Sequence, residues 1–192
     1  RMVVAAVHDM ANEGQEIDTA ALKTAVLRAN QQVLDAAAGN SSYEGMGSTA
    51  TILHVDEHAG MAYYAHVGDS RLYLLRHGIF RQVSRDHSYV EELVARGQLS
   101  EVEAQHHPRK NLLLRAVGIE EHLHVDGDSF PLAAGDRLLL ATDGLTNMVD
   151  DDELSSLLGG NFADVAERMV ERALAGGGSD NITAIALAYE IP

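Results

Sequence analysis

The sequence contains no cysteine in 192 residues, which excludes disulfides, thiolate metal sites and catalysis by a low-pKa thiolate. Basic residues are also scarce, because 14 Lys and Arg stand against 29 Asp and Glu and leave a formal net charge of -15. Such an excess of negative charge opposes binding to nucleic acid or to an anionic membrane surface. It fits either a solubility feature or a site that bound cations neutralise.

Long apolar runs are absent as well. No stretch of 18 or more apolar residues occurs, so no membrane span is predicted. The hydrophobic fraction of 46% is enough for one domain with a sizeable core. We therefore expect a single domain over residues 1–192, with neither a nucleic-acid nor a membrane partner. A cytoplasmic monomer is also expected, although the composition does not establish the localisation.

Two aspartates stand at the ends of apolar, strand-like runs. Asp143 follows the run over residues 137–141, and Asp180 comes just before the run over residues 182–187. Antiparallel pairing of these runs would bring both carboxylates to one sheet edge. Hard divalent cations such as Mg²⁺ take oxygen ligands and keep several waters, so this edge is a candidate half of a metal site.

Asp69 has a similar placement, because the strand-like run over residues 61–67 ends just before it. Asp-Gly and Asp-Asn pairs are ordinary turn material, and each of the three aspartates taken alone is better explained as a turn residue. The metal hypothesis therefore depends on the set of three.

The first part of the chain is predicted to be helical. Val3, Val7 and Met10 have helical spacing without a preceding cap, so this helix is entered midway. A second helix begins at the capping residue Asp18 and ends at residues 39–40. Its apolar stripe consists of Leu22, Val26, Ala29, Val33 and Ala37.

After residue 50 the pattern changes to strands. Strands are expected over residues 51–55, 61–67, 72–76 and 80–83, as a meander and not as a βαβ repeat, and later over 138–141 and 182–187. The polar stretch over residues 88–105 predicts short helices, and further helices are expected over 154–158 and 162–174. The acidic run at 150–153 is better explained as a helix start than as a metal cluster.

Four short segments, taken together, form a pattern that is specific for one protein family. They are residues 45–50 (GMGSTA), 65–71 (AHVGDSR), 141–146 (ATDGLT) and 178–183 (GSDNIT). In order and spacing, and with SRDHS at residues 84–88, they resemble the metal-dependent protein phosphatases of the PPM type, also called protein phosphatase type 2C, in their compact bacterial form. The resemblance spans nearly the whole chain.

The resemblance implies an α+β fold, an antiparallel β-sandwich flanked by helices on both sides in a four-layer αββα arrangement. It also implies a binuclear Mn²⁺ or Mg²⁺ centre, in which metal-activated water hydrolyses phosphoserine and phosphothreonine of a protein substrate. By carry-over, Asp143 and Asp180 ligate the core ions, and Asp69 shares a third, weaker ion with Asp143. A cognate Ser/Thr kinase pathway is the expected partner.

Residues 88–115 match the flap that lies beside the centre in this family and is thought to bias substrate choice. Arg109 and Asn111, with the neighbouring Lys110 and Arg115, could contact phosphate or acidic residues of the substrate. A solvated loop whose cations balance nearby acids explains each of them equally well.

One departure from the family is large. The N-terminal strands, which carry a phosphate-binding Arg and an Asp-Gly-x-Gly-Gly metal motif, are absent from the sequence, so the fold is expected to be incomplete at its N-terminus. The family's general-acid histidine follows that motif, so no catalytic residue is assigned here. The alternative function is a noncatalytic phosphatase-like module that binds a phosphoprotein or a regulatory partner.

Other chemistries are less well supported. The ten histidines lack the HExxH arrangement of a zinc site, and His122 and His124 are predicted to alternate on a strand. His66 is expected to be packed or hydrogen-bonded, and His87 could orient the start of the flap. Neither a Gly-x-Ser-x-Gly nucleophile elbow nor a P-loop lysine is present.

Overall fold

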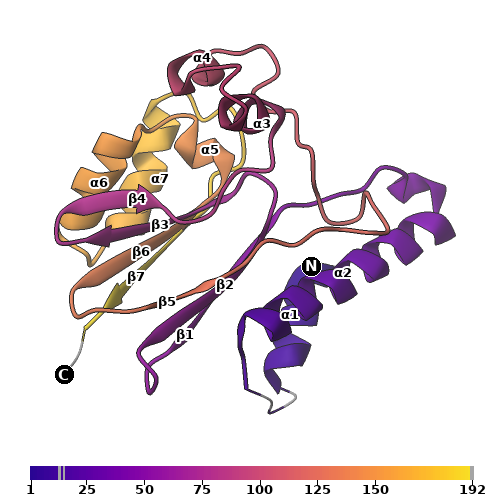
Figure 1. Ribbon diagram of the computed structural model, residues 1–192. Coiled ribbons are helices and arrows are strands. Elements are labelled where there is room, and N and C mark those ends of the chain that lie inside the picture. Colours follow the sequence, from indigo (N-terminus) through magenta and orange to yellow (C-terminus); the bar gives the residue numbers. More distant parts are fainter. Residues whose placement is uncertain (13, 15, 191–192) are drawn as a thin grey trace. The chain divides into compact units, whose positions relative to one another are not determined.

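The computed structural model describes residues 1–12, 14 and 16–190. The chain forms two compact units, residues 1–69 with 86–130 (the first unit) and residues 70–85 with 131–192 (the second unit). The first unit contains an antiparallel sheet of order β1-β2-β5, and the second contains one of order β4-β3-β6-β7 (Figure 1). These two sheets with their helices confirm the predicted α+β class. The prediction of one domain over residues 1–192 stays a prediction.

In the first unit, a long helix packs on the three-stranded sheet. Asp18 caps this helix as predicted, because its carboxylate accepts a hydrogen bond from the Ala21 N–H at 2.8 Å. The predicted stripe is buried up to Val33 and joins Ala65 and Val67 of the sheet in one apolar core. The elements are α1 (Met2–Asn12), α2 (Thr19–Gly39), η1 (Ser41–Tyr43), β1 (Ala50–Asp56), β2 (Met61–Val67), α3 (Tyr89–Ala95), α4 (Glu101–Gln105) and β5 (Ser129–Pro131).

In the second unit, two amphipathic helices cover one face of the four-stranded sheet (Figure 1). Leu154, Leu158 and Met169 of these helices are fully buried and form a core with Tyr73 and Leu139 of the strands. The elements are β3 (Arg71–Arg76), β4 (Ile79–Gln82), β6 (Asp136–Ala141), α5 (Asp143–Thr146), α6 (Asp151–Gly159), α7 (Val165–Ala175) and β7 (Ala184–Tyr189).

The acidic run at residues 150–153 begins α6, as predicted. The Asp150 carboxylate accepts a hydrogen bond from the Glu153 N–H at 2.8 Å, which satisfies one of the free donors at the helix start. The run is therefore a helix cap followed by an acidic first turn.

The predicted meander is wrong. β1 pairs with β2 in one sheet, whereas β3 pairs with β4 and β6 in the other, so the chain changes sheets between Val67 and Arg71. Alternating apolar residues indicate a strand but do not select its partner. The strand predicted for His122 and His124 is also wrong, because the former lies in a turn and the latter outside any strand.

Several element boundaries differ from the predicted ones. For example, β7 begins at Ala184 and α7 at Val165, two and three residues later than predicted, whereas β6 begins at Asp136, two residues earlier. The short α5 and β5 were not predicted, because four and three residues are too few to show a period. Within the part of the chain that the structure describes, no helix is both long and apolar enough to cross a membrane.

Candidate metal centre

Asp143 and Asp180 lie beyond the same end of one strand pair. β6 and β7 are antiparallel, and the register pairs Ala141 at the end of β6 with Ala184 at the start of β7. Asp143 follows that end of β6, and Asp180 precedes that start of β7. The predicted antiparallel pairing is therefore confirmed, and it brings both aspartates to one end of the second sheet.

Thr142 joins the two segments that carry these aspartates. Its hydroxyl donates to the Asn181 carbonyl at 3.1 Å and accepts from the Thr183 N–H at 2.9 Å. Its own N–H donates to the Thr183 carbonyl at 3.1 Å. Because these three bonds surround the residue before Asp143 and the residue after Asp180, they hold the two aspartates in register.

Gly144 allows the same two segments to approach closely. A Cβ at this position would lie 2.3 Å from the Asn181 carbonyl oxygen and 2.9 Å from its carbonyl carbon. Backbone atoms cannot move aside as a flexible side chain can, so only glycine fits here without displacing the segment before β7. The next residue, Leu145, is fully buried in the core of the second unit and anchors the short helix α5.

The chemistry of the pair suits a hard divalent cation. Asp143 is half-buried and Asp180 is exposed, so both carboxylates are open to solvent and could bind an ion that keeps several waters. One oxygen of Asp180 accepts from the Asn181 N–H at 2.7 Å, which orients its carboxylate. Among the described residues no cluster of three or more His, Asp or Glu side chains is arranged as a complete metal site.

Asp69 belongs to the first unit, where it follows Gly68 at the end of β2. Gly68 has φ +110°, and a Cβ there would lie 2.3 Å from Cγ2 of Thr49. Thr49 stands in one of the motif segments and Gly68 in another, so this close contact explains why the second segment has a glycine at position 68. The assignment of Asp69 as a metal ligand stays a prediction.

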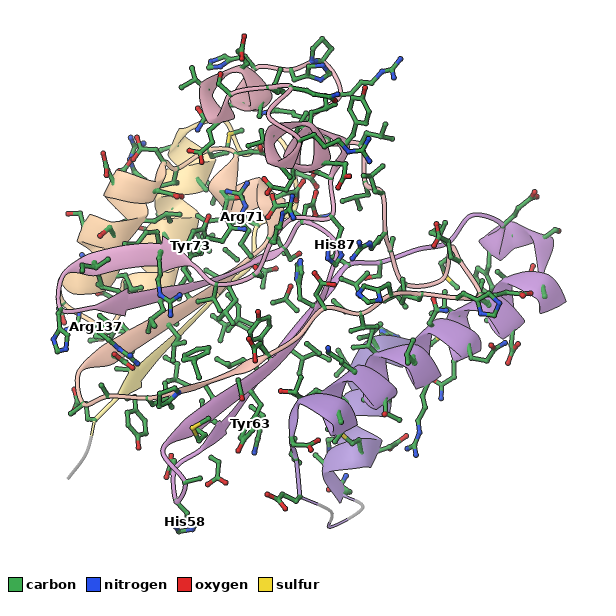
Figure 2. All side chains as sticks on the ribbon, viewed as in Figure 1. His58, Tyr63, Arg71, Tyr73, His87 and Arg137 are labelled. Carbon is green, nitrogen blue, oxygen red and sulfur yellow. The ribbon has the colours of Figure 1, made fainter. Side chains whose placement is uncertain are left out.

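His87, which is labelled in Figure 2, binds Gly68 with both its side chain and its backbone. The Gly68 N–H donates to Nδ1 of the imidazole at 3.2 Å, and the Gly68 carbonyl accepts from the His87 N–H at 2.7 Å. The other ring nitrogen, Nε2, lies 3.1 Å from Oδ2 of Asp126. Arg115 contacts Oδ1 of that carboxylate with Nη1 at 3.1 Å.

Burial and charge shift the pKa values in this cluster. Burial lowers the pKa of His87, although the hydrogen bond and charge of Asp126 oppose that effect. Burial alone would raise the pKa of Asp126, but the hydrogen bond from His87 and the nearby charges of His87, Arg115 and His124 outweigh it, so this pKa is lowered. At neutral pH, His87 is therefore a neutral imidazole beside the ionised carboxylate of Asp126.

The residues predicted to contact substrate differ in their surroundings. Arg109 is exposed and lies over the Tyr89 ring, with 5.8 Å from Cζ to the ring centroid, and Asn111 is exposed as well. Arg115 instead pairs with Asp126, so the charge-balancing alternative holds for it. The roles of Arg109 and Asn111 toward a substrate stay predictions.

His66 is fully buried, and its Nδ1 lies 2.9 Å from the Thr51 hydroxyl, which confirms that it is packed and hydrogen-bonded. The contact between His87 and Asp126 was missed from the sequence. Residues 84–88 belong to one of the motifs, but Asp126 stands outside every motif, and only the fold brings it to His87. A charged residue that follows an expected strand carries no signal of its partner.

Comparisons with known proteins agree with this geometry. The sequence matches the Protein phosphatase 2C family over residues 1–185. It is 38% identical over 173 residues to the serine/threonine phosphatase stp of Listeria monocytogenes, covering 89% of this chain and 68% of that protein. The solved structure of the Mycobacterium tuberculosis serine/threonine phosphatase PstP/Ppp has a TM-score of 0.90 and 34% identity, covering 99% of this chain and 80% of that one. The catalytic domain of PstP solved with two manganese ions has a TM-score of 0.85 and 32% identity, covering 96% and 77%.

Proposed function

This chain belongs to the protein phosphatase 2C family, and we propose that it is a metal-dependent serine/threonine phosphatase domain that hydrolyses phosphoserine and phosphothreonine in proteins. The single observation that carries the proposal is the placement of Asp143 and Asp180 at one end of the β6–β7 pair, joined through Thr142. Two solvent-open carboxylates held in this way match the oxygen ligands that Mn²⁺ and Mg²⁺ accept.

The ions would supply the chemistry that the chain lacks. When bound, a pair of divalent cations lowers the pKa of a water molecule and neutralises charge on the phosphoryl oxygens. The chain's own residues bind and orient: Asp143 and Asp180 would hold the core ions, and Asp69 would contribute to a third. Thr142 and Gly144 keep the carboxylate-bearing segments in register.

The acidic character of the chain is compatible with this proposal. A formal charge of -15 repels a phosphorylated protein unless cations neutralise the site. We propose that Arg109 and Asn111 of the flap contact the phosphorylated substrate. We also propose that the protein acts in the cytoplasm of a bacterium, opposite a Ser/Thr kinase.

The test is hydrolysis of p-nitrophenyl phosphate and of a phosphothreonine peptide, with and without Mn²⁺. The protein is assayed both as these 192 residues and with any residues that its gene encodes before Arg1. Turnover that requires Mn²⁺ in either form supports the phosphatase. A longer form that binds the phosphopeptide without turning it over at any Mn²⁺ concentration supports the noncatalytic module instead.

A further inference from the structure

Gly68 is bound through both of its polar backbone groups by one residue, His87. Its N–H belongs to the peptide plane before Gly68, and its carbonyl belongs to the plane after it, which also contains the nitrogen and Cα of Asp69. Since His87 holds both planes, it sets the direction in which the chain enters Asp69. The imidazole can do so only if Nδ1 accepts a hydrogen bond.

The contacts of the other ring nitrogen decide the tautomer. With the proton on Nε2, the ring donates to Asp126 Oδ2 at 3.1 Å, and Nδ1 is free to accept from Gly68. With the proton on Nδ1, that N–H would face the Gly68 N–H, and Nε2 would face the carboxylate as an acceptor against an acceptor. Only the 3.3 Å contact from Arg115 Nη1 to Nε2 would be satisfied.

The charged form of the ring is disfavoured for the same reason. An imidazolium carries a proton on both nitrogens, so its Nδ1–H would again face the Gly68 donor. It would also be nearly completely buried, with the Arg115 guanidinium close by. The neutral ring with its proton on Nε2 pairs a donor with an acceptor in both of the shorter contacts, at 3.1 Å to Asp126 and 3.2 Å to Gly68, and leaves only the longer 3.3 Å contact with Arg115 Nη1 without an acceptor.

Asp126 is itself held in place by the neighbouring strand. Its N–H donates to the His66 carbonyl at 3.0 Å, and its carbonyl accepts from the His66 N–H at 2.8 Å, so it forms an isolated bridge to β2. The His66 ring packs against the His87 ring, with 4.9 Å between centroids. The carboxylate is therefore presented to His87 from a fixed backbone.

We propose that Asp126 holds His87 in the tautomer protonated on Nε2, and that His87 and Asp126 are thereby positioning residues for the Gly68–Asp69 turn. This proposal rests on the proposed function, because the turn matters for activity only if Asp69 serves a metal centre. Neither residue need touch the substrate or an ion.

The first measurement needs neither metal nor substrate. Side-chain ¹⁵N shifts of the histidine-labelled, metal-free protein at neutral pH distinguish a protonated ring nitrogen from an unprotonated one, and His87→Asn identifies the His87 signals by their loss. The expected result is a protonated Nε2 and an unprotonated Nδ1. A protonated Nδ1 in His87 would overturn the proposal.

Asp126→Asn tests the cause of that state. An amide that turns its NH₂ group to His87 selects the wrong tautomer, and one that turns its oxygen there places NH₂ against Arg115. We expect hydrogen exchange at the Gly68 amide to accelerate by about 10-fold, as loss of one hydrogen bond allows. The Mn²⁺ concentration for half-maximal turnover should rise by about 10-fold, as is common when a residue that orients a metal ligand is changed.

The matched control is Asp128→Asn, which removes the same charge two residues along the chain. The Asp128 side chain is exposed and accepts a hydrogen bond from the Ser129 N–H, a role that an amide oxygen can keep. This variant should leave both measurements unchanged. If Asp126→Asn, shown to be folded, also leaves both unchanged, the proposal is wrong.

Two substitutions of His87 distinguish a positioning role of this side chain from a role in packing alone. His87→Asn retains an acceptor oxygen near the place of Nδ1, whereas His87→Ala does not, so the Gly68 amide should exchange more slowly in the first variant. Equal exchange in the two would contradict the proposal, and this pair decides the matter if Asp126→Asn does not fold. Wild-type protein with the expected tautomer but no Mn²⁺-dependent turnover would refute the proposed function alone.

Discussion

Gly68 and Gly144 each stand next to a candidate metal ligand, yet the two units support them differently. Gly68 is held by a histidine whose state depends on a carboxylate and a guanidinium. Gly144 is held by close packing against the Asn181 backbone, with the neutral hydroxyl of Thr142 beside it. A turn that carries a candidate metal ligand can thus be held either by a charged network or by neutral contacts. The two turns should therefore respond to different substitutions and differ in their dependence on pH.

The largest effect is expected from the ligands themselves. Changes to residues that only orient a metal ligand commonly cost about 10- to 100-fold in metal affinity or activity. Loss of a ligand itself should cost more, so Asp143→Asn should reduce Mn²⁺-dependent turnover by more than about 100-fold. Asp69→Asn should cost less, because it is predicted to serve only a third, weaker ion. The measurement is kcat across a Mn²⁺ titration, with the exposed Asp152→Asn as the control. Unchanged turnover in Asp143→Asn would refute the site assignment.

Asp136→Asn should lower stability without affecting the candidate centre, since Asp136 begins β6 and Asp143 follows its other end. The buried Asp136 carboxylate accepts from Arg76 Nε at 2.8 Å, from Arg76 Nη2 at 2.6 Å and from the Ala133 N–H at 2.8 Å. Loss of a charged partner here should reduce the free energy of unfolding by about 2 to 3 kcal/mol. Urea denaturation measures this change, and turnover of the folded variant should remain near that of wild type.

The same carboxylate gives a pH dependence. Burial would raise the pKa of Asp136, but the hydrogen bonds from Arg76 and Ala133 outweigh it and lower the pKa below its usual value. The stabilisation is therefore complete above the unfolded pKa of about 3.9 and is lost as the pH falls through the lower folded value. The difference in unfolding free energy between wild type and Asp136→Asn should shrink on acidification in this range. A difference that grows instead would contradict the sign of the shift.

Gly144→Ala tests the close packing between Gly144 and the Asn181 backbone, because it adds a methyl group without changing any charge. The added methyl must displace the Asn181 backbone, and overpacking of this kind typically costs about 1 to 3 kcal/mol of unfolding free energy. Gly39→Ala is the matched control, because nothing lies within 4 Å of a Cβ at that position. We also expect weaker Mn²⁺ binding by calorimetry in Gly144→Ala only. Equal stability of the two variants would show that the close contact is not required.

Thr142→Val should have the smallest effect. It keeps the shape of the side chain but removes the hydroxyl that bonds Asn181 and Thr183. A net loss of about 1 kcal/mol of unfolding free energy is expected, together with a modest rise in the Mn²⁺ requirement. The effect should be the same at pH 6 and pH 8 in thermal melts, because no titratable group takes part, and a pH-dependent effect would contradict the neutral character of this contact.

Much of the secondary structure could be predicted from the local pattern of apolar and capping residues in the sequence. The Asp18 cap, the stripe from Leu22 to Val33 and the acidic start of α6 were predicted because capping and helical periodicity act within a few residues. The antiparallel pairing that brings Asp143 and Asp180 to one sheet end was also predicted. The change of sheets after β2 was not, because the pattern of a strand does not depend on which neighbour pairs with it.

The sequence by itself determined the class of chemistry, since the absence of cysteine removes thiolates and the ordered aspartate motifs resemble one family of metal-dependent phosphatases. It also determined where helices begin, because caps are local hydrogen bonds. Only the tertiary structure decided how the candidate ligands are supported. Asp126 reaches His87 across 39 positions of sequence, and Gly144 meets Asn181 across 37. Contacts at such separations depend on how the sheets assemble, and no local spacing encodes them.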